Sequence, residues 1–222
     1  MRDSYRDELN ATTELIVTVA GLVRTAVQDA TTALVTADLT IAERVISGDA
    51  RIDELTKESE QRSFQLLARQ APVAGELRTV VAVLRMSYSL DRMGDLAAHI
   101  AKIARLRYPE VAAPEPVADQ IKQMAETADS MIATAITTLE NRDAEAAAGL
   151  ATADSKMDEL RSDQFHLLLG DDWEYGVEKA VDTALLGRYY ERIADHAVAM
   201  GARTIYIVTG EAPEGENWPS SF

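Results

Sequence analysis

The second half of this chain repeats the first, and no other feature constrains the fold as strongly. With a shift of 105 residues, Leu34 falls on Leu139, Asp38 on Asp143 and Asp53 on Asp158. Beyond the second turn of each half the shift becomes 100, because the second hairpin is five residues shorter. Self-similarity at a fixed period indicates an internal duplication, so the two halves should share one architecture.

The repeating unit has the hydrophobic pattern of long helices. Apolar and small residues recur every seven positions at Leu9, Ile16, Val23 and Ala30, and a second series interleaves at Thr13, Ala20, Val27 and Leu34. This spacing predicts one apolar stripe along a helix that packs in a bundle. The six prolines lie between such segments, at Pro72, Pro109, Pro114, Pro116, Pro213 and Pro219.

Five breaks divide the chain into six helices of roughly 25–35 residues each. The breaks fall near Ala37-Asp38, Pro72, Pro109 to Pro116, Asn141 to Asp143, and Gly170 to Gly176. Short turns between long helices make sequential helices antiparallel neighbours. We therefore expect an all-α protein built as two tandem, duplicated three-helix bundles. The first bundle should occupy residues 1–108, the second 116–210, and a mobile tail 211–222.

Composition excludes several classes of function. The chain has a formal net charge of −15 and no basic stripe, which argues against nucleic-acid binding. It has no cysteine, so any metal must be held by oxygen or imidazole. No apolar run reaches the length of a membrane span, and the first residues do not resemble a signal peptide. A cytoplasmic protein without membrane insertion is expected.

One short acidic motif occurs in both halves. Asp91 and Asp95 lie four residues apart in the first copy, and Glu191 and Asp195 occupy the same places in the second. Residues four apart lie on the same face of a helix, where like charges destabilise it by about 0.2–0.5 kcal/mol. The repeated acidic pair therefore indicates a use for the negative charge.

A second acidic pair faces the first in each half. In the first hairpin Asp53 and Asp91 lie equally far from Pro72, and so do Asp49 and Asp95. In the second hairpin the equal-height pairs are Asp154 with Asp195 and Asp158 with Glu191. Because neighbouring helices pack 8–10 Å apart, four carboxylates should converge in each half.

Such a cluster suits a multivalent cation, which would offset the mutual repulsion of the carboxylates. Oxygen ligands favour hard ions such as Mg²⁺, Ca²⁺, Mn²⁺ or oxidised iron. The alternative is an acidic surface paired with arginine and lysine; Arg188, one turn before Glu191, could neutralise it. His99 and His196 follow the motifs closely and are candidate outer ligands.

The strings LDRMGDLAAHIAKIA and YERIADHAVAMGA resemble the two signature segments of the PhoU family of phosphate-response regulators. The resemblance extends over residues 1–210 and includes the duplication, the helix count and the motif positions. Asp91 stands where the family more often has glutamate. The positions of this chain that match the acidic residues of the family's motif are Asp91, Asp95, Glu191 and Asp195.

The resemblance implies a cytoplasmic homodimer that binds metal ions through these motifs, with iron favoured and manganese, magnesium, calcium or zinc as alternatives. It implies negative regulation of phosphate uptake and of the phosphate-starvation response. The implied partners are the ATPase of the phosphate ABC transporter and the sensor histidine kinase of the phosphate two-component system.

Two other interpretations share this fold: a structural helical adaptor without metal, and an accessory subunit of a secondary phosphate transporter. A metal-dependent hydrolase is a further alternative. No nucleophile and base stand in a recognisable context and no glycine-rich phosphate loop is present, so we expect a protein that is not an enzyme.

Overall fold

A computed structural model of the chain describes residues 2–69 and 71–211. This part of the chain forms six α-helices and no strand. Their bounds are α1 Arg2–Thr36, α2 Leu39–Arg69, α3 Ala74–Arg107, α4 Glu115–Asn141, α5 Ala144–Leu169 and α6 Gly176–Thr209. The predicted all-α fold of two three-helix bundles is confirmed, and every predicted break separates two helices. Of the tail predicted over 211–222, residues 212–222 lie outside the described residues.

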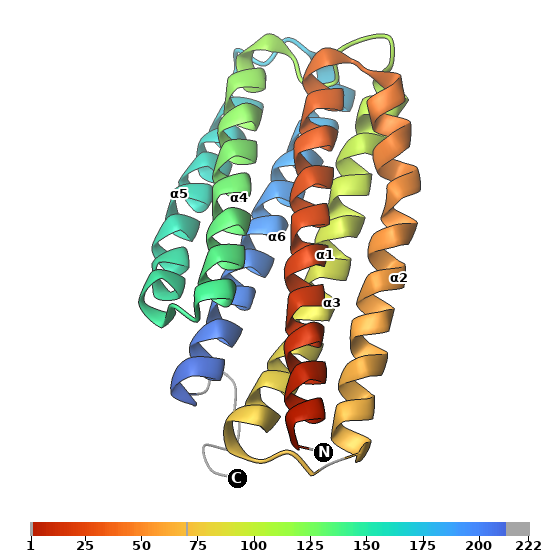
Figure 1. Cartoon of the computed structure of the whole chain (residues 1–222). Helices are drawn as coiled ribbons and strands as arrows, with labels where there is room; N and C mark the ends of the chain where they lie inside the picture. Colours follow the sequence, from red (N-terminus) through yellow and green to blue (C-terminus); the bar gives the residue numbers. More distant parts are fainter. Residues whose placement is uncertain (1, 70, 212–222) are drawn as a thin grey trace.

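Helices α1, α2 and α3 pack on one another in the first half, and α4, α5 and α6 do so in the second. The backbones of the two halves approach each other between α1 and α4 and between α3 and α6. In Figure 1, α1 and α4 lie in front of α3 and α6, while α2 and α5 lie at the outer edges. None of the helices in the described ranges is both long and apolar enough to span a lipid bilayer.

The duplication extends to the turns. Ala37 and Arg142, 105 residues apart, both adopt left-handed backbone conformations, with φ of 52° and 53°. The next residue caps the following helix in each half: Asp38 Oδ1 accepts a hydrogen bond from the Ile41 amide, and Asp143 Oδ1 accepts one from Ala146. An aspartate that accepts from the third residue of a helix satisfies an amide with no partner inside the helix.

The predicted stripe along α1 is buried with one exception. Leu9, Ile16, Val23 and Ala30 are buried, as are Ala20, Val27 and Leu34, but Thr13 is half-buried and its neighbour Thr12 is fully buried. A second correction concerns Pro116, which lies inside the first turn of α4 and not between helices. Proline is tolerated there because the first helical amides have no intrahelical acceptor.

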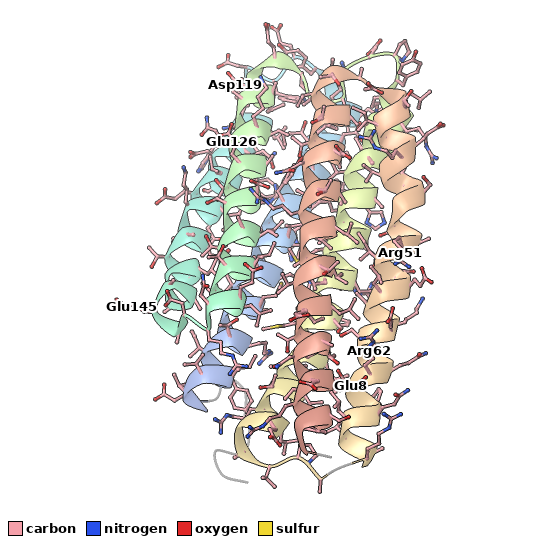
Figure 2. All side chains as sticks on the ribbon, in the orientation of Figure 1. Glu8, Arg51, Arg62, Asp119, Glu126 and Glu145 are labelled. Atoms are coloured by element: carbon pink, nitrogen blue, oxygen red, sulfur yellow. The ribbon has the colours of Figure 1, made fainter. Side chains whose placement is uncertain are left out.

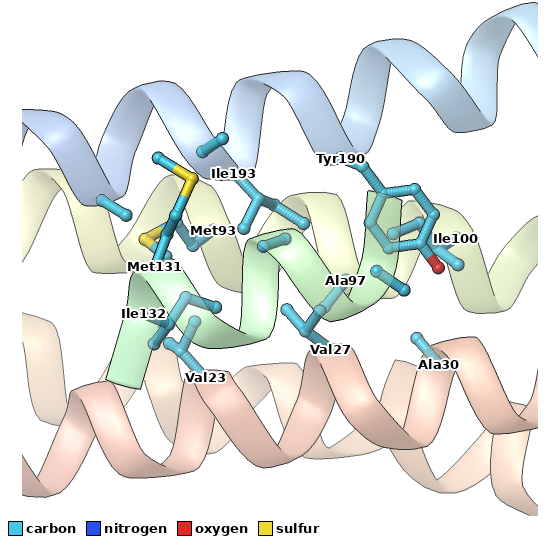
Figure 3. Packing of buried hydrophobic residues seen from close by; sticks show 14 of the residues in the cluster. Val23, Val27, Ala30, Met93, Ala97, Ile100, Met131, Ile132, Tyr190 and Ile193 are labelled. Carbon is cyan, nitrogen blue, oxygen red and sulfur yellow. The ribbon is translucent and has the colours of Figure 1, made fainter. Parts of the chain in front are cut away.

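One apolar core extends across both halves. Val23 and Val27 of α1 pack with Met93 of α3, Ile132 of α4 and Ile193 of α6, all with at most 1% of their surface exposed (Figure 3). Polar contacts fix the same junction. The buried Tyr190 hydroxyl bonds to Thr31 Oγ1 at 2.8 Å. The Arg24 guanidinium holds both Asp129 oxygens at 2.7 and 2.8 Å.

Arg24 and Asp129 are equivalent positions of the repeat, since they are 105 residues apart. Equivalent positions of two similar units meet where a local two-fold axis passes between the units. The halves are therefore related by an approximate two-fold axis between α1 and α4. At this axis the two copies have diverged to opposite charges, which attract each other.

A shared core predicts that one cavity destabilises the whole molecule. Ile132→Ala should lower the free energy of unfolding by about 2–5 kcal/mol, the range for truncation of a buried isoleucine. Thr137→Ala, on the exposed face of the same helix, should change it by no more than about 0.5 kcal/mol. Urea unfolding followed by circular dichroism measures both, and a single transition is expected. Two separate transitions, with only one shifted, would contradict the shared core.

Candidate metal centre

The first half brings four carboxylates together across α2 and α3. Asp49 and Asp53 project from α2, and Asp91 and Asp95 from α3. Burial and the three neighbouring carboxylates, Asp95 foremost, raise the pKa of Asp49 to about 6, against a smaller opposing effect of Lys102. Burial, followed by Asp53 and Asp95, also raises the pKa of Asp91. Each cluster member thus lies within electrostatic reach of the others, at the heights predicted from Pro72.

Close approach of the two helices depends on Gly94, inside the first motif. A Cβ atom at this position would lie 3.0 Å from Asp49 Oδ1 and 3.1 Å from Ile52 Cγ2, both tighter than ordinary van der Waals contacts. The second motif has Ala194 at the equivalent place, fully buried. A methyl group at Gly94 would therefore press directly on the Asp49 carboxylate.

Asp49 Oδ1 is buried and has no hydrogen-bond partner among the described residues. A buried carboxylate oxygen without a partner carries an unfavourable desolvation free energy. Asp91 differs, because the Thr56 hydroxyl lies 3.4 Å from its Oδ1, although the Asp53 carbonyl oxygen competes for the same proton at 3.1 Å. Asp95 pairs with Arg92 at 3.0 Å and Asp53 with Lys57 at 3.6 Å. The unpartnered oxygen of Asp49 is the position in this cluster that most requires a cation.

The second half forms the equivalent cluster across α5 and α6, from Asp154, Asp158, Glu191 and Asp195. Burial, then Asp195, Asp158 and Glu191, raise the pKa of Asp154. Burial is also the main cause of the raised pKa of Asp195, which Arg192 and Arg188 oppose. The second half therefore also groups four carboxylates that interact electrostatically.

Cations neutralise the second cluster more fully. Arg188 pairs with Glu191 at 2.7 Å, which agrees with the alternative of an ion-paired acidic surface at this position. Arg161 also reaches Glu191, at 3.3 Å, and this ion pair was not predicted from the sequence. The position of Arg161 in the repeat is that of Thr56, whose hydroxyl lies beside Asp91 in the first cluster. A comparison of the two halves position by position could have found this pair of residues.

The two candidate outer ligands lie between α3 and α6. The His196 ring is 6.5 Å from that of Tyr88, and the His99 ring is 5.4 Å from that of Tyr189. Burial, and after it the positive charges of Arg192 and Arg92, lower the pKa of His196 to about 4. His196 is therefore neutral at physiological pH, and the two arginines disfavour a cation beside it. A ligand role for either histidine stays a prediction.

The donor set fits a hard cation by its chemistry, since every cluster member offers carboxylate oxygen. The arrangement is not a finished coordination cage: among the described residues, no three His, Asp or Glu side chains are already placed to hold one metal ion. Binding would require changes of carboxylate rotamer. The unpartnered Asp49 oxygen, together with its three acidic neighbours, makes the first cluster the better candidate.

The fold and the two clusters define a class: a duplicated three-helix-bundle protein with a carboxylate cluster on each half. Comparison with known proteins gives the family. The model of the PhoU domain matches residues 16–104 and 121–204, so the chain belongs to the PhoU family.

Curated relatives match along essentially the whole chain. The chain is 41% identical to the phosphate-specific transport system accessory protein PhoU homolog 1 of Mycobacterium leprae, with all of both chains covered. It is 42% identical to PhoU homolog 2 of Mycobacterium tuberculosis, over 96% of this chain and 100% of that one.

Solved structures confirm the fold. PhoU from Pseudomonas aeruginosa superposes with a TM-score of 0.88 at 25% identity, covering 93% of this chain and all of the other. The phosphate transport system regulatory protein PhoU from Streptococcus pneumoniae gives 0.85 at 26% identity, covering 93% and 98%.

The raised pKa of Asp49 predicts a pH-dependent stability. Between about pH 4 and pH 6 the native state retains a proton that the unfolded chain releases, so the free energy of unfolding falls as pH rises through this window. Asp49→Asn removes this titration. At pH 7.5 the variant should be more stable than the parent by roughly 1–2 kcal/mol, less than for a fully buried group because Asp49 keeps partial contact with water.

Urea unfolding of the parent and of Asp49→Asn, at pH 4 and at pH 7.5 with a chelator present, measures this difference in the free energy of unfolding. The advantage of the variant should be lost at pH 4, where the parent carboxyl is protonated. Asp119→Asn, at a highly exposed carboxylate on α4, should show no such pH-dependent difference. An Asp49→Asn variant less stable than the parent at pH 7.5 would contradict this account of the cluster.

Proposed function

We propose that this chain is a non-enzymatic adaptor that restrains phosphate uptake and the phosphate-starvation response. It would act in the cytoplasm as a homodimer, coupling the ATPase of the phosphate ABC transporter to the sensor histidine kinase of the phosphate two-component system. The family membership supports a role with a phosphate transport system, since the curated relatives are named as its accessory proteins. The observation that carries the proposal is the pair of carboxylate clusters preserved in both halves.

The clusters are proposed to bind multivalent metal ions, with iron favoured and manganese, magnesium, calcium or zinc as alternatives. Asp49, Asp53, Asp91 and Asp95 would hold metal in the first half. Their equivalents in the second half are Asp154, Asp158, Glu191 and Asp195. When bound, the metal would supply positive charge to an acidic surface. The raised pKa values of Asp49 and Asp154 support this role, because they arise first from burial and then from neighbouring carboxylates, and a bound cation would offset both.

Metal would control partner binding through desolvation. A partner that covers the free cluster must bury carboxylates whose charges are not neutralised, and such burial is strongly unfavourable. A bound cation removes most of this penalty, so the same surface becomes easier to cover. The cluster residues thus bind and position the ion, while the surrounding helix faces provide the contact area.

Partner binding should depend on both the carboxylates and the metal. Asp91→Ala/Asp95→Ala should weaken binding to the transporter ATPase at least about tenfold, equal to 1.4 kcal/mol, because the ion loses two ligands. Chelation should weaken the parent complex by a similar factor. Biolayer interferometry with the purified ATPase measures both effects, and circular dichroism should show unchanged helicity.

The matched control is Asp119→Ala/Glu126→Ala, which removes two exposed carboxylates from α4 (Figure 2). It makes the same change in net charge and should leave ATPase binding unchanged. In cells with abundant phosphate, the Asp91/Asp95 variant should raise phosphate uptake and the control should not. Binding that is lost in the variant but insensitive to chelator would favour the metal-free adaptor. Binding unaffected by both treatments would refute the proposed role of the cluster.

A further inference from the structure

An apolar groove opens between α5 and α6 near their connecting loop. This loop lies at the end of α6 opposite its C-terminus (Figure 1). The hollow has a volume of about 420 Å³. Six of the residues that line it are Phe165, Leu168, Leu169, Trp173, Val177 and Val181. Leu169, the last residue of α5, and Val177, in the first turn of α6, are 82% and 80% exposed. We call this feature the α5–α6 groove.

The α5–α6 groove continues from the second carboxylate cluster. Along α5, Asp154, Asp158, Arg161, Phe165 and Leu168 follow at spacings of four and three, which places them on one helix face. Arg161 joins the two regions, because it pairs with Glu191 and its guanidinium lies over the Phe165 ring, 4.0 Å from the ring centre. A partner that covers the cluster would therefore extend naturally into the groove.

Comparison of the halves shows that the fold does not require this apolar surface. By the shift of 105, Phe165 replaces Glu60 and Leu168 replaces Ser63. On the opposing helix, the shift of 100 matches Val181 with Val81. Val81 is partly buried in the first half, whereas Val181 is 51% exposed. The second half therefore carries an uncovered apolar surface where the first half is polar or covered.

The shape of the groove suits a third helix. Two antiparallel helices form its walls, and its lining on α6 extends from Gly176 to Ala184, which is about two turns. A helix laid in such a groove presents apolar side chains at three- and four-residue spacings. The exposed area would be covered by a short amphipathic helix.

The surrounding charge selects among such helices. Asp163, Asp171, Asp172 and Glu174 are exposed at this end of the hairpin, and the whole chain has a net charge of −15. A second copy would bring the same acidic loop against itself, and an anionic lipid surface would be repelled. A basic helix is attracted to this rim.

We propose that the α5–α6 groove binds a short amphipathic helix of a partner protein, with an apolar stripe flanked by lysine or arginine. The proposal deepens the proposed adaptor function, on which it rests for the partner's role in phosphate regulation. Binding in the groove itself requires no metal. Binding to the groove can therefore be tested in the presence of a chelator, where metal at the carboxylate clusters makes no contribution.

The probe is a synthetic 18-residue helix of leucine and lysine with one apolar stripe. A second peptide of equal composition has its leucines scattered around the helix. Trp218→Phe leaves Trp173, which lines the groove, as the only tryptophan of the chain. The striped helix should bind in a saturable manner and shift the Trp173 emission to shorter wavelength. The scattered peptide should bind at least about tenfold more weakly.

The groove variant is Phe165→Glu/Leu168→Ser, which installs the residues of the first half at equivalent helical positions. It should weaken binding of the striped peptide at least about tenfold, although the added negative charge would strengthen non-specific attraction to lysine. Phe64→Ser is the matched control, since Phe64 is a 62% exposed apolar residue at the corresponding end of α2. This control should bind the peptide as the parent does. Circular dichroism and urea unfolding verify that both variants are folded.

Equal binding of the striped and scattered peptides, or undiminished binding by the groove variant, would show charge attraction alone and overturn the proposal.

Sedimentation of the parent and the groove variant tests whether a second copy of the chain occupies the groove. A dimer that forms in the parent and is lost in the groove variant would identify a second chain as the occupant. Groove-dependent binding to phosphatidylglycerol vesicles would identify lipid instead. Failure of the peptide to bind, with metal-dependent ATPase binding intact, would refute the groove and leave the proposed function standing.

Discussion

The continuous apolar core shared by α1, α3, α4 and α6 is the constraint on which the rest of the molecule depends. It fixes α3 and α6 against each other, and each of these helices carries one acidic motif. α2 and α5 then pack on the outer sides and bring the facing carboxylates. Contacts such as Arg24 with Asp129 set the junction of the halves near an approximate two-fold axis. The two clusters are therefore placed by packing and not by attraction between their members.

The carboxylate clusters destabilise the fold that the core stabilises, because their members are partly buried and repel one another. In the second half Arg161 and Arg188 offset much of this repulsion at Glu191. In the first half Asp49 keeps an unpartnered buried oxygen, and Gly94 allows the helices to approach closely enough to create this situation. Local destabilisation retained at one place in a well-packed protein is common at binding sites. The two halves thus share a geometry but differ in how strongly they would require a cation.

Much of this arrangement was predictable from sequence because it follows from periodicity. Equal distances from Pro72 placed Asp49 beside Asp95, since antiparallel helices rise equally on both sides of a turn. The helix breaks followed from proline, glycine and the capping aspartates. Arg161 was missed because only acidic positions were compared across the hairpin, although the same register places Arg161 level with Arg188, one turn from Glu191. Whether its guanidinium reaches Glu191 depends on rotamers. The exposed groove around Phe165 was also missed, because apolar residues at helical spacing normally indicate core, and only packing reveals which remain uncovered.

Each hairpin groups four carboxylates across two helices, and we propose that changes of rotamer let them bind a multivalent cation. Anomalous diffraction from crystals grown with manganese tests it most directly. We expect an anomalous peak among Asp49, Asp53, Asp91 and Asp95, stronger than any peak at the second cluster, and we expect this peak to be lost in Asp49→Asn/Asp95→Asn. Manganese absent from both clusters at saturating concentration, with the carboxylates paired only to arginine and lysine, would contradict it.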